Sequence, residues 1–375
     1  MHRIFLRNIE KGRTDEALRR ISIISFTRQG CDLSRILAKQ LEGEETRLYT
    51  KCALDEKEEG ITYVEERIGQ WAGRQMKEQN TLLFIGACGI AVRAIAPHIT
   101  DKIHDSPVLV MDENGQYVIP ILSGHVGGAN EIAQVIGAGT GAVPVITTAT
   151  DLHHVFAVDV FARKNHLHIV NPGGIAKVSS KILSGRKLAV SVEAGHLPEK
   201  LCLPKGVELA KYPPKEKVDI VISSGAVCSS EEMQKASLWL APKEYVIGMG
   251  CRKGKEAEAI EAFISQALEE SGIFVRQVKA LATITLKARE EGLLSWSQKQ
   301  RIPFMTYTPE ELERVEGSIH PSQFVKAVTG VDNVCERAAL KAAGPGGKLV
   351  YEKHGRDGMT LAIAKGKWSV RFDET

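Results

Sequence analysis

The sequence predicts an α/β fold with mostly parallel, Rossmann-like sheets in an N-terminal, a small middle and a C-terminal α/β domain. The first observation is that buried strands alternate with amphipathic helices. Strands are expected at 21–26, at 45–50 and at the start of 81–95, where the chain runs through Gly86 and Gly89 into a helix. Apolar residues recur at helical spacing within 33–41 and 64–77. The second is that these strands end in turns rich in glycine or hydroxyl groups. Both features are typical of a doubly wound sheet.

The composition indicates an ordinary soluble protein of two or three domains. The chain has 375 residues, of which 43% are hydrophobic and 25% charged. Its net charge is +3 with both signs interspersed, which favours neither a nucleic-acid groove nor a polybasic membrane anchor. We find no apolar run with the length of a signal-peptide core or a membrane span. We therefore expect a cytoplasmic protein that binds neither nucleic acid nor membrane.

Cysteine and histidine positions do not predict a metal site. The seven cysteines are scattered without a C-x-x-C pair, which argues against a disulfide framework and a structural zinc site. His166 and His168 would face one way in a strand, but a third ligand is not evident. Cys335 is interpreted as a buried packing thiol rather than a nucleophile.

Changes in composition along the chain predict the domain boundaries. Residues 1–20 are charged and weakly periodic, and they form an N-terminal extension to a first domain over 21–151. Loops rich in proline and lysine follow within 152–242, which predicts a small middle domain. A further strand, glycine turn and helix begin at Lys243, which predicts a C-terminal domain over 243–367.

The most distinctive stretch, 122–131, follows an expected strand and opens into an expected helix. Glycines in its turn allow close backbone approach, and the first helical turn presents unpaired N–H groups that suit an oxyanion or a carboxylate. The same stretch carries a hydroxyl, an imidazole, an amide and a carboxylate, on Ser123, His125, Asn130 and Glu131. The alternative is an ordinary βα turn with a serine near the helix cap.

Two more turns of the first domain carry candidate ligand groups. Gly86 and Gly89 form a turn that lacks the full dinucleotide fingerprint, and Arg93 follows as a clamp for a ligand carboxylate or as a solvated helix residue. The strand at 142–146 ends in hydroxyls and one carboxylate that could bind a polar ligand, on Thr147, Thr148 and Asp151. Thr150 or Asp151 could instead cap the next helix. Ligands bind at the carboxyl ends of parallel strands, where we expect these turns to lie.

Two glycine-containing turns have other expected roles. Asp112–Gly115 is predicted to be a hairpin turn, with Asn-Gly at its tip, between strands at 108–111 and 117–122. Gly248 and Gly250 are predicted to form a turn before a helix, where Arg252 would bind an anionic side chain of a ligand. The spacing of a P-loop is not met there.

Several long motifs, in the same order, resemble the CbiG family of anaerobic cobalamin biosynthesis. In the N-terminal half they are GIAVRAIAPH (89–98), LSGHVGGANE (122–131) and PVITTATD (144–151). In the C-terminal half they are GMGCR (248–252), PSQFV (321–325) and TGVDNVCE (329–336). The resemblance covers about 21–365, so only the leading twenty residues fall outside it.

The resemblance implies a cobalt-precorrin-5A hydrolase, which is a hydrolase acting on a carbon–carbon bond. Water would open the ring A δ-lactone, and the extruded carbon would leave with its methyl group as acetaldehyde, giving cobalt-precorrin-5B. The implied ligand is a cobalt-corrinoid substrate that brings its own cobalt, so no cofactor is expected. Neighbouring enzymes of the same pathway are candidate partners. The alternative function is a non-catalytic carrier of corrinoid intermediates, and a nucleotide-dependent enzyme is disfavoured by the incomplete glycine fingerprints.

The expected mechanism needs a base, oxyanion donors and an acid. His125 is the candidate base, and the backbone N–H groups of Gly127 and Gly128 are the candidate oxyanion donors. His125 or Glu131 would move the proton during acetaldehyde release. Ser123 as a covalent nucleophile is the alternative, and Arg93 and Arg252 would hold carboxylates of the corrinoid.

Overall fold

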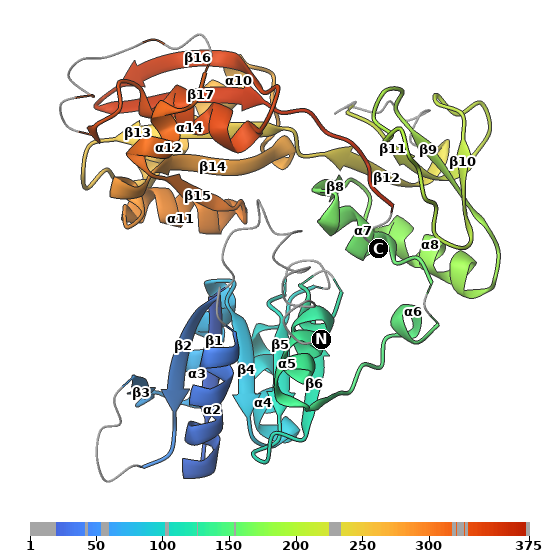
Figure 1. The fold of residues 1–375 in the computed structure, drawn as a ribbon, viewed down its shortest axis with the longest axis vertical. Helices are drawn as coiled ribbons and strands as arrows, with labels where there is room; N and C mark the ends of the chain where they lie inside the picture. Colours follow the sequence, from blue (N-terminus) through green and yellow to red (C-terminus); the bar gives the residue numbers. More distant parts are fainter. Residues whose placement is uncertain are drawn as a thin grey trace. The chain divides into compact units, whose positions relative to one another are not determined.

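The computed structural model describes residues 20–41, 44–53, 60–101, 105–125, 127–153, 155–224, 234–316, 320, 326 and 329–372. They form two compact units, one ending at residue 153 and one beginning at Val155 (Figure 1). Residues 1–19 of the expected N-terminal extension lie outside the described part of the chain, as does the motif at 321–325.

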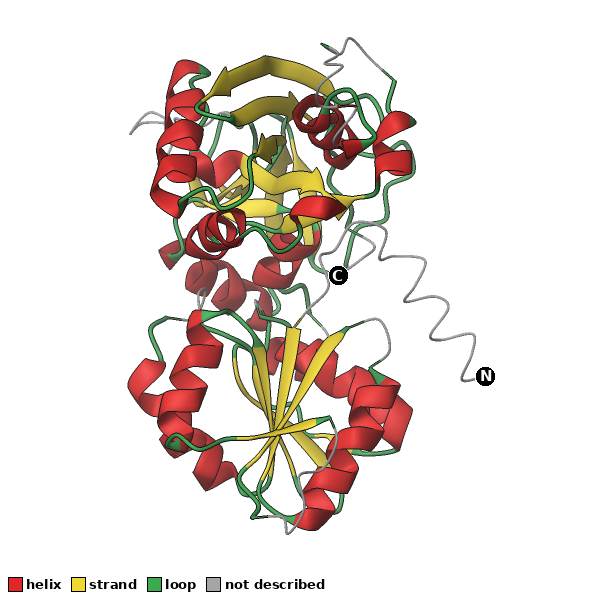
Figure 2. Cartoon of the chain, turned by 90° about the vertical axis from the view of Figure 1, so that its left-hand side faces the viewer, coloured by secondary structure: helices red, strands yellow, loops and turns green. Residues whose placement is uncertain are grey.

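The first unit contains a seven-stranded sheet in the order β3-β2-β1-β4-β5-β6-β7. The strands are β1 (Arg20–Ser25), β2 (Glu45–Thr50), β3 (Ile61–Tyr63), β4 (Thr81–Ile85), β5 (Val108–Met111), β6 (Tyr117–Leu122) and β7 (Val143–Pro144). Helices lie on both sides of the sheet (Figure 2), namely α2 (Arg28–Gln40), α3 (Ile68–Lys77), α4 (Cys88–Ile95), α5 (Ala129–Thr140), the short α6 (Ala149–Leu152) and the 3-10 turn η1 (Ala96–His98). The predicted doubly wound, mostly parallel sheet is confirmed.

Alternate residues of the central strands supply the two cores of this unit. In β4, Leu83 and Ile85 join the core beneath α2 and α5, whereas Leu82 and Phe84 join the core with α3 and α4. Successive side chains of a strand point to opposite faces, so a strand covered on both sides is apolar throughout. This is why the strands read as continuous apolar runs in the sequence.

One strand direction changes the position of the candidate turns. β5 and β6 are antiparallel, as the predicted Asn-Gly hairpin requires, and β7 is parallel to β6. Leu122 pairs with Val108, and Val108 pairs with Leu82 near the start of β4. The four residue steps from Leu82 to Gly86 span about 13 Å of strand. The turn after β6 therefore lies at the end of the strands opposite to Gly86. The expectation that these turns share one end of the sheet is wrong.

The second unit contains two five-stranded sheets. The first has the order β10-β9-β11-β12-β8, with β8 (Leu167–Ile169), β9 (Leu188–Val192), β10 (Val207–Ala210), β11 (Val218–Ile222) and β12 (Ala236–Pro242). Its helices are α7 (Val158–Lys164) and α8 (Gly173–Leu183). The second has the order β15-β14-β13-β17-β16, with β13 (Tyr245–Cys251), β14 (Val278–Ile284), β15 (Phe304–Tyr307), β16 (Lys348–Arg356) and β17 (Met359–Lys365).

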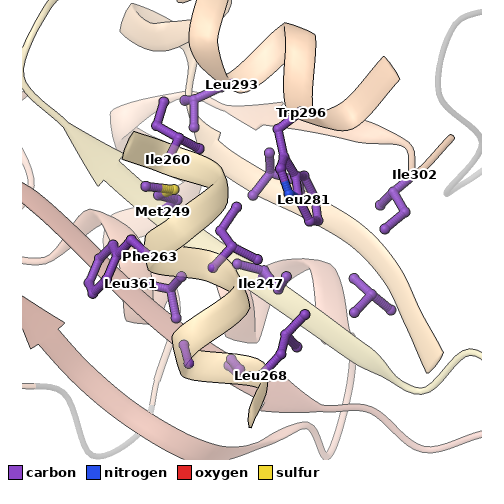
Figure 3. Close-up of a cluster of buried hydrophobic side chains, with 14 of the residues drawn as sticks. Ile247, Met249, Ile260, Phe263, Leu268, Leu281, Leu293, Trp296, Ile302 and Leu361 are labelled. Atoms are coloured by element: carbon purple, nitrogen blue, oxygen red, sulfur yellow. The ribbon is translucent and has the colours of Figure 1, made fainter. Parts of the chain in front are cut away.

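Helices cover both faces of the second of these sheets. The α-helices are α10 (Ala257–Glu270), α11 (Glu291–Gln300), α12 (Pro309–Glu313) and α14 (Val334–Ala343), with 3-10 turns η2 (Val275–Gln277) and η3 (Thr285–Lys287). Figure 3 shows apolar side chains of α10 and α11, such as Phe263 and Trp296, packed against Ile247 of β13 and Leu281 of β14. The neighbouring Val246 faces the other way and packs with α14.

Gly248 and Gly250 lie inside β13, so the glycine turn predicted for them is wrong. A Cβ at Gly248 would collide with the backbone carbonyl of Cys335 and would lie 2.8 Å from the Cβ of Ala339. A Cβ at Gly250 would lie 2.9 Å from the Thr360 hydroxyl. These glycines let α14 and β17 approach the central strand closely.

Residues 366–372, here the C-terminal strap, pack on elements of the first sheet of this unit. The His196 ring stacks on Trp368 with centroids 3.6 Å apart. The Asn165 side chain accepts from the backbone N–H of Arg371 at 2.7 Å and donates to its carbonyl at 2.9 Å. Phe372 stacks on Phe161 of α7 with centroids 4.9 Å apart. The strap therefore joins the two sheets of the second unit.

Phe372→Ala is expected to destabilise the second unit by about 3 kcal/mol, because it removes a buried ring from an aromatic cluster. Phe372 is 3% exposed and packs against Phe156 and Phe161. The measurement is hydrogen exchange of α7, which should become faster. Phe274→Ala is the matched control, since Phe274 is 43% exposed. Equal hydrogen exchange of α7 in the two variants would show that the strap contributes little to the stability of the second unit.

Candidate functional site

Five polar side chains meet beside the turn that follows β6. The imidazole Nε2 of His125 lies 2.7 Å from Asp151 Oδ2 and 3.2 Å from the hydroxyl of Thr150. The amide Nδ2 of Asn130 donates to the same Asp151 Oδ2 at 2.7 Å and to the hydroxyl of Thr148 at 3.1 Å. His125, Asn130 and Thr150 are buried. The structure thus brings together four of the predicted site residues and adds Thr150.

The turn is built so that these side chains fit. Ser123 has a left-handed backbone, with φ 54°, and Gly128 has φ 84° at the N-cap of α5. A Cβ at Gly124 would lie 2.6 Å from Asn130 Oδ1, so only glycine leaves room for this amide. A Cβ at Gly127 would lie 2.6 Å from the Ser123 hydroxyl. The glycines therefore serve close packing within the turn.

The start of α5 differs from the expected anion seat. The N–H groups of Ala129 and Asn130 donate to the carbonyls of Ser123 and Gly124, at 3.2 and 3.0 Å. The N–H of Gly128 donates to the carbonyl of His125 at 3.1 Å. The expectation that these first-turn donors are unpaired is therefore wrong, and Gly128 could serve as an oxyanion donor only after its present hydrogen bond breaks.

The contact with Asp151 selects one tautomer of a neutral His125 ring. A carboxylate only accepts hydrogen bonds, so the proton of a neutral imidazole lies on Nε2, which faces Asp151. The lone pair is then on Nδ1. An imidazole held by a carboxylate in one orientation is a common arrangement for moving protons during catalysis.

None of the residues that the structure describes makes a contact that would activate Ser123. Its hydroxyl is buried and, among the described residues, has no hydrogen-bond partner. A serine nucleophile needs a base within hydrogen-bonding distance. In this arrangement the covalent alternative therefore lacks its base. Glu131 lies in the first turn of α5, and Thr147 is exposed before α6.

The other predicted site residues lie elsewhere. Gly86, with φ 155°, and Gly89 lie at the carboxyl end of β4, where the exposed Arg93 donates to the Gly89 carbonyl at 3.2 Å. Gly250 lies within β13 of the second unit, and the exposed Arg252 follows that strand. Within the first unit, the structure separates Gly86 from His125 by the length of the sheet.

The sequence held a signal for the contact between His125 and Asp151, which are 26 residues apart. β6 and β7 are parallel neighbours, so the chain leaves both strands in the same direction. His125 follows β6 and Asp151 follows β7. Residues after adjacent parallel strands are expected to meet. Thr150 is expected from the sequence to cap a helix or to bind a ligand, and its hydroxyl instead contacts the imidazole.

Groups that could hold a metal or act as a thiol nucleophile are not found at the positions considered. Among the residues that the structure describes, no three His, Cys, Asp or Glu side chains form a metal-binding group. His166 precedes β8 in a left-handed conformation, with φ 52°, so it does not share a strand with His168 as expected. Burial raises the pKa of Cys335 to about 11, which keeps this thiol protonated at neutral pH.

The free energy of unfolding is expected to decrease as the pH is lowered from 6.5 to about 4, because of His168. Burial, with help from Lys243 and Arg276, lowers the pKa of His168 to about 4 from the ordinary 6.5. In this window the unfolded chain binds a proton that the folded chain does not, so acid favours unfolding. His168→Gln should flatten the dependence, as measured by thermal unfolding at several pH values. His354→Gln, at an exposed position, is the control, and identical slopes in the two variants would contradict this account.

A search of the described residues for a helix of sufficient length and apolarity to cross a bilayer finds none.

Comparisons with known proteins match the chain in both units. The family model for the cobalamin synthesis G N-terminal region matches residues 70–151, and that for the cobalamin synthesis G C-terminus matches 245–364. Cobalt-precorrin-5A hydrolase of Priestia megaterium is 30% identical over 354 residues, which cover 92% of this chain and 94% of that one. The enzyme of that name from Salmonella typhimurium is 31% identical over 352 residues, covering 92% and 97%.

A shorter relative and a solved structure are also similar to this chain. Protein CobE of Sinorhizobium sp. is 31% identical over 120 residues, which cover 32% of this chain and 78% of that one. Among solved structures, a cobalamin biosynthesis protein G homolog from Sulfolobus solfataricus has a TM-score of 0.39 and 20% identity, covering 94% of this chain and 98% of that one.

Proposed function

The chain belongs to the CbiG family, and we propose from this premise that it hydrolyses cobalt-precorrin-5A to cobalt-precorrin-5B with release of acetaldehyde. The observation that carries the proposal is the match to two cobalt-precorrin-5A hydrolases over 92% of this chain and more than nine tenths of theirs. The N-terminal family match, 70–151, contains His125, Asn130 and Asp151.

The cluster around Asp151 supports a hydrolytic reaction. Lactone opening needs a group that takes a proton from water as its oxygen bonds to the carbonyl carbon. The lactone C–O bond then breaks, and the leaving oxygen takes a proton to become an alcohol. The alcohol next loses its O–H proton, its carbon–carbon bond to the ring breaks with the electron pair going to the macrocycle, and acetaldehyde leaves. His125 and Asp151 form a pair that can move these protons.

The substrate is a cobalt corrinoid, which supplies its own cobalt, so the proposed reaction uses no cofactor of the protein. A corrinoid carries several acetate and propionate groups, and exposed arginines such as Arg93 and Arg252 suit these carboxylates. The proposal places the protein in the cytoplasm, and it includes transfer of the corrinoid to and from neighbouring pathway enzymes. These finer points rest on the family and on charge.

The test is incubation of the purified full chain with cobalt-precorrin-5A, with acetaldehyde trapped and the corrinoid followed by mass. Acetaldehyde in proportion to the substrate consumed, with the lactone opened, is the expected result. Tight binding of the corrinoid without acetaldehyde would instead identify a carrier, and absence of both would refute the proposal.

A further inference from the structure

We propose that Asp151 is the group that meets the water and the substrate, and that His125 and Asn130 are positioning residues behind it. The inference rests on the proposed function and assigns the base within that site. It reverses the roles expected from the sequence, in which the imidazole was the base.

The first observation is the difference in burial within the pair. The side chain of His125 is 6% exposed, whereas that of Asp151 is 34% exposed. A group that takes a proton from water must reach that water within hydrogen-bonding distance. The carboxylate is accessible to solvent in the described structure, whereas the imidazole is almost fully buried.

The second observation is how the two oxygens of Asp151 are used. Oδ2 accepts from His125 Nε2 and from Asn130 Nδ2, each at 2.7 Å. None of the described residues donates a hydrogen bond to Oδ1. One oxygen is therefore held by two donors from buried residues, and the other is left to contact a ligand.

The third observation is that both donors are themselves fixed. The hydroxyl of Thr150 contacts the imidazole at Nε2, and the amide of Asn130 also donates to the hydroxyl of Thr148. Asn130 is 7% exposed and packs directly against Gly124. Donors whose positions are locked orient a catalytic group better than mobile donors do.

In the resulting step, Oδ1 of Asp151 takes a proton from water while the water oxygen bonds to the lactone carbonyl carbon. The electron pair of the carbonyl moves to its oxygen and returns as the lactone C–O bond breaks. The protonated carboxyl can then return its proton to the leaving oxygen, so one residue serves as base and acid in turn. The hydrogen bonds from His125 and Asn130 hold Oδ2 throughout.

Variants that separate a donor from a base test the assignment. His125→Gln keeps an N–H donor at the position of Nε2 but cannot take a proton, so its turnover should stay within about tenfold of wild type. Asp151→Asn keeps the shape and removes the base, so turnover should fall by about 10²-fold or more. Added formate should restore part of the activity of Asp151→Ala. Asp32→Asn, at an exposed position in α2, is the matched control and should equal wild type.

The outcomes separate the assignment from the proposed function. The assignment would be overturned, and the function left intact, if Asp151→Asn turned over within tenfold of wild type. It would also be overturned if His125→Gln were as slow as His125→Ala and added imidazole restored the activity of His125→Ala. A wild-type chain that binds cobalt-precorrin-5A without releasing acetaldehyde would overturn both. Circular dichroism of each variant checks that it folds, and rescue by formate shows directly that the Asp151→Ala site is assembled.

Discussion

Gly124→Ala is expected to lower turnover by about 10²-fold while the first unit stays folded. The new methyl group would lie 2.6 Å from Asn130 Oδ1 and 3.2 Å from its Nδ2. That amide cannot move aside without losing its hydrogen bonds to Thr148 and Asp151. A displacement of about 1 Å in a catalytic group can cost this factor in rate. The measurement is acetaldehyde release, with corrinoid binding measured separately.

The control for this variant is Gly69→Ala. Gly69 lies in α3 of the same unit, and a Cβ there would meet only the Ala94 carbonyl oxygen, at 3.7 Å. Its turnover should therefore equal that of wild type. Full activity in Gly124→Ala would mean that the position of Asn130 does not matter for the reaction, which would contradict the proposed role of its amide.

Gly248→Ala is expected to destabilise the second unit by about 3 kcal/mol or more. A methyl group there would strike the backbone carbonyl of Cys335, and a backbone atom in α14 cannot rotate away as a side chain can. The helix would have to move off the central strand of its sheet. Hydrogen exchange of β13 and α14 should become much faster, and this local measurement avoids treating a chain of two units as one transition.

Gly173→Ala is the matched control for this second change. Gly173 begins α8, and a Cβ there would meet no atom within 4 Å. The substitution should be neutral or slightly stabilising, because alanine restricts the unfolded chain more than glycine does. If the amides of β13 and α14 exchanged as slowly in Gly248→Ala as in this control, the close contact between β13 and α14 would not be needed for the stability of the second unit.

Local patterns in the sequence were sufficient to predict most elements of the first unit. The strand at 108–111, the hairpin at Asp112–Gly115 and the strand at 117–122 agree with β5, the turn and β6. These predictions depend on apolar runs and turn residues that are close in the chain. The hairpin also implied that β6 reverses direction. The expectation that all the candidate turns lie at one end of the sheet did not take this reversal into account.

The remaining differences come from contacts between distant segments. Gly248 and Gly250 look like a turn because glycine favours turns, and only the packing of α14 on β13 explains them as strand residues. The unpaired donors expected at the start of α5 are satisfied by carbonyls of the same turn, which depends on the left-handed Ser123. The relative burial of His125 and Asp151 likewise depends on how the turn after β6 meets α6, which no local pattern contains.

The most direct test of the account is a single turnover of cobalt-precorrin-5A by the wild-type chain in water labelled with heavy oxygen. If water attacks the lactone carbonyl, one labelled oxygen should appear in the ring A acetate of the product, and rapidly trapped acetaldehyde should carry the original lactone oxygen. An unlabelled acetate, or a corrinoid returned unchanged without acetaldehyde, would contradict the proposed hydrolysis.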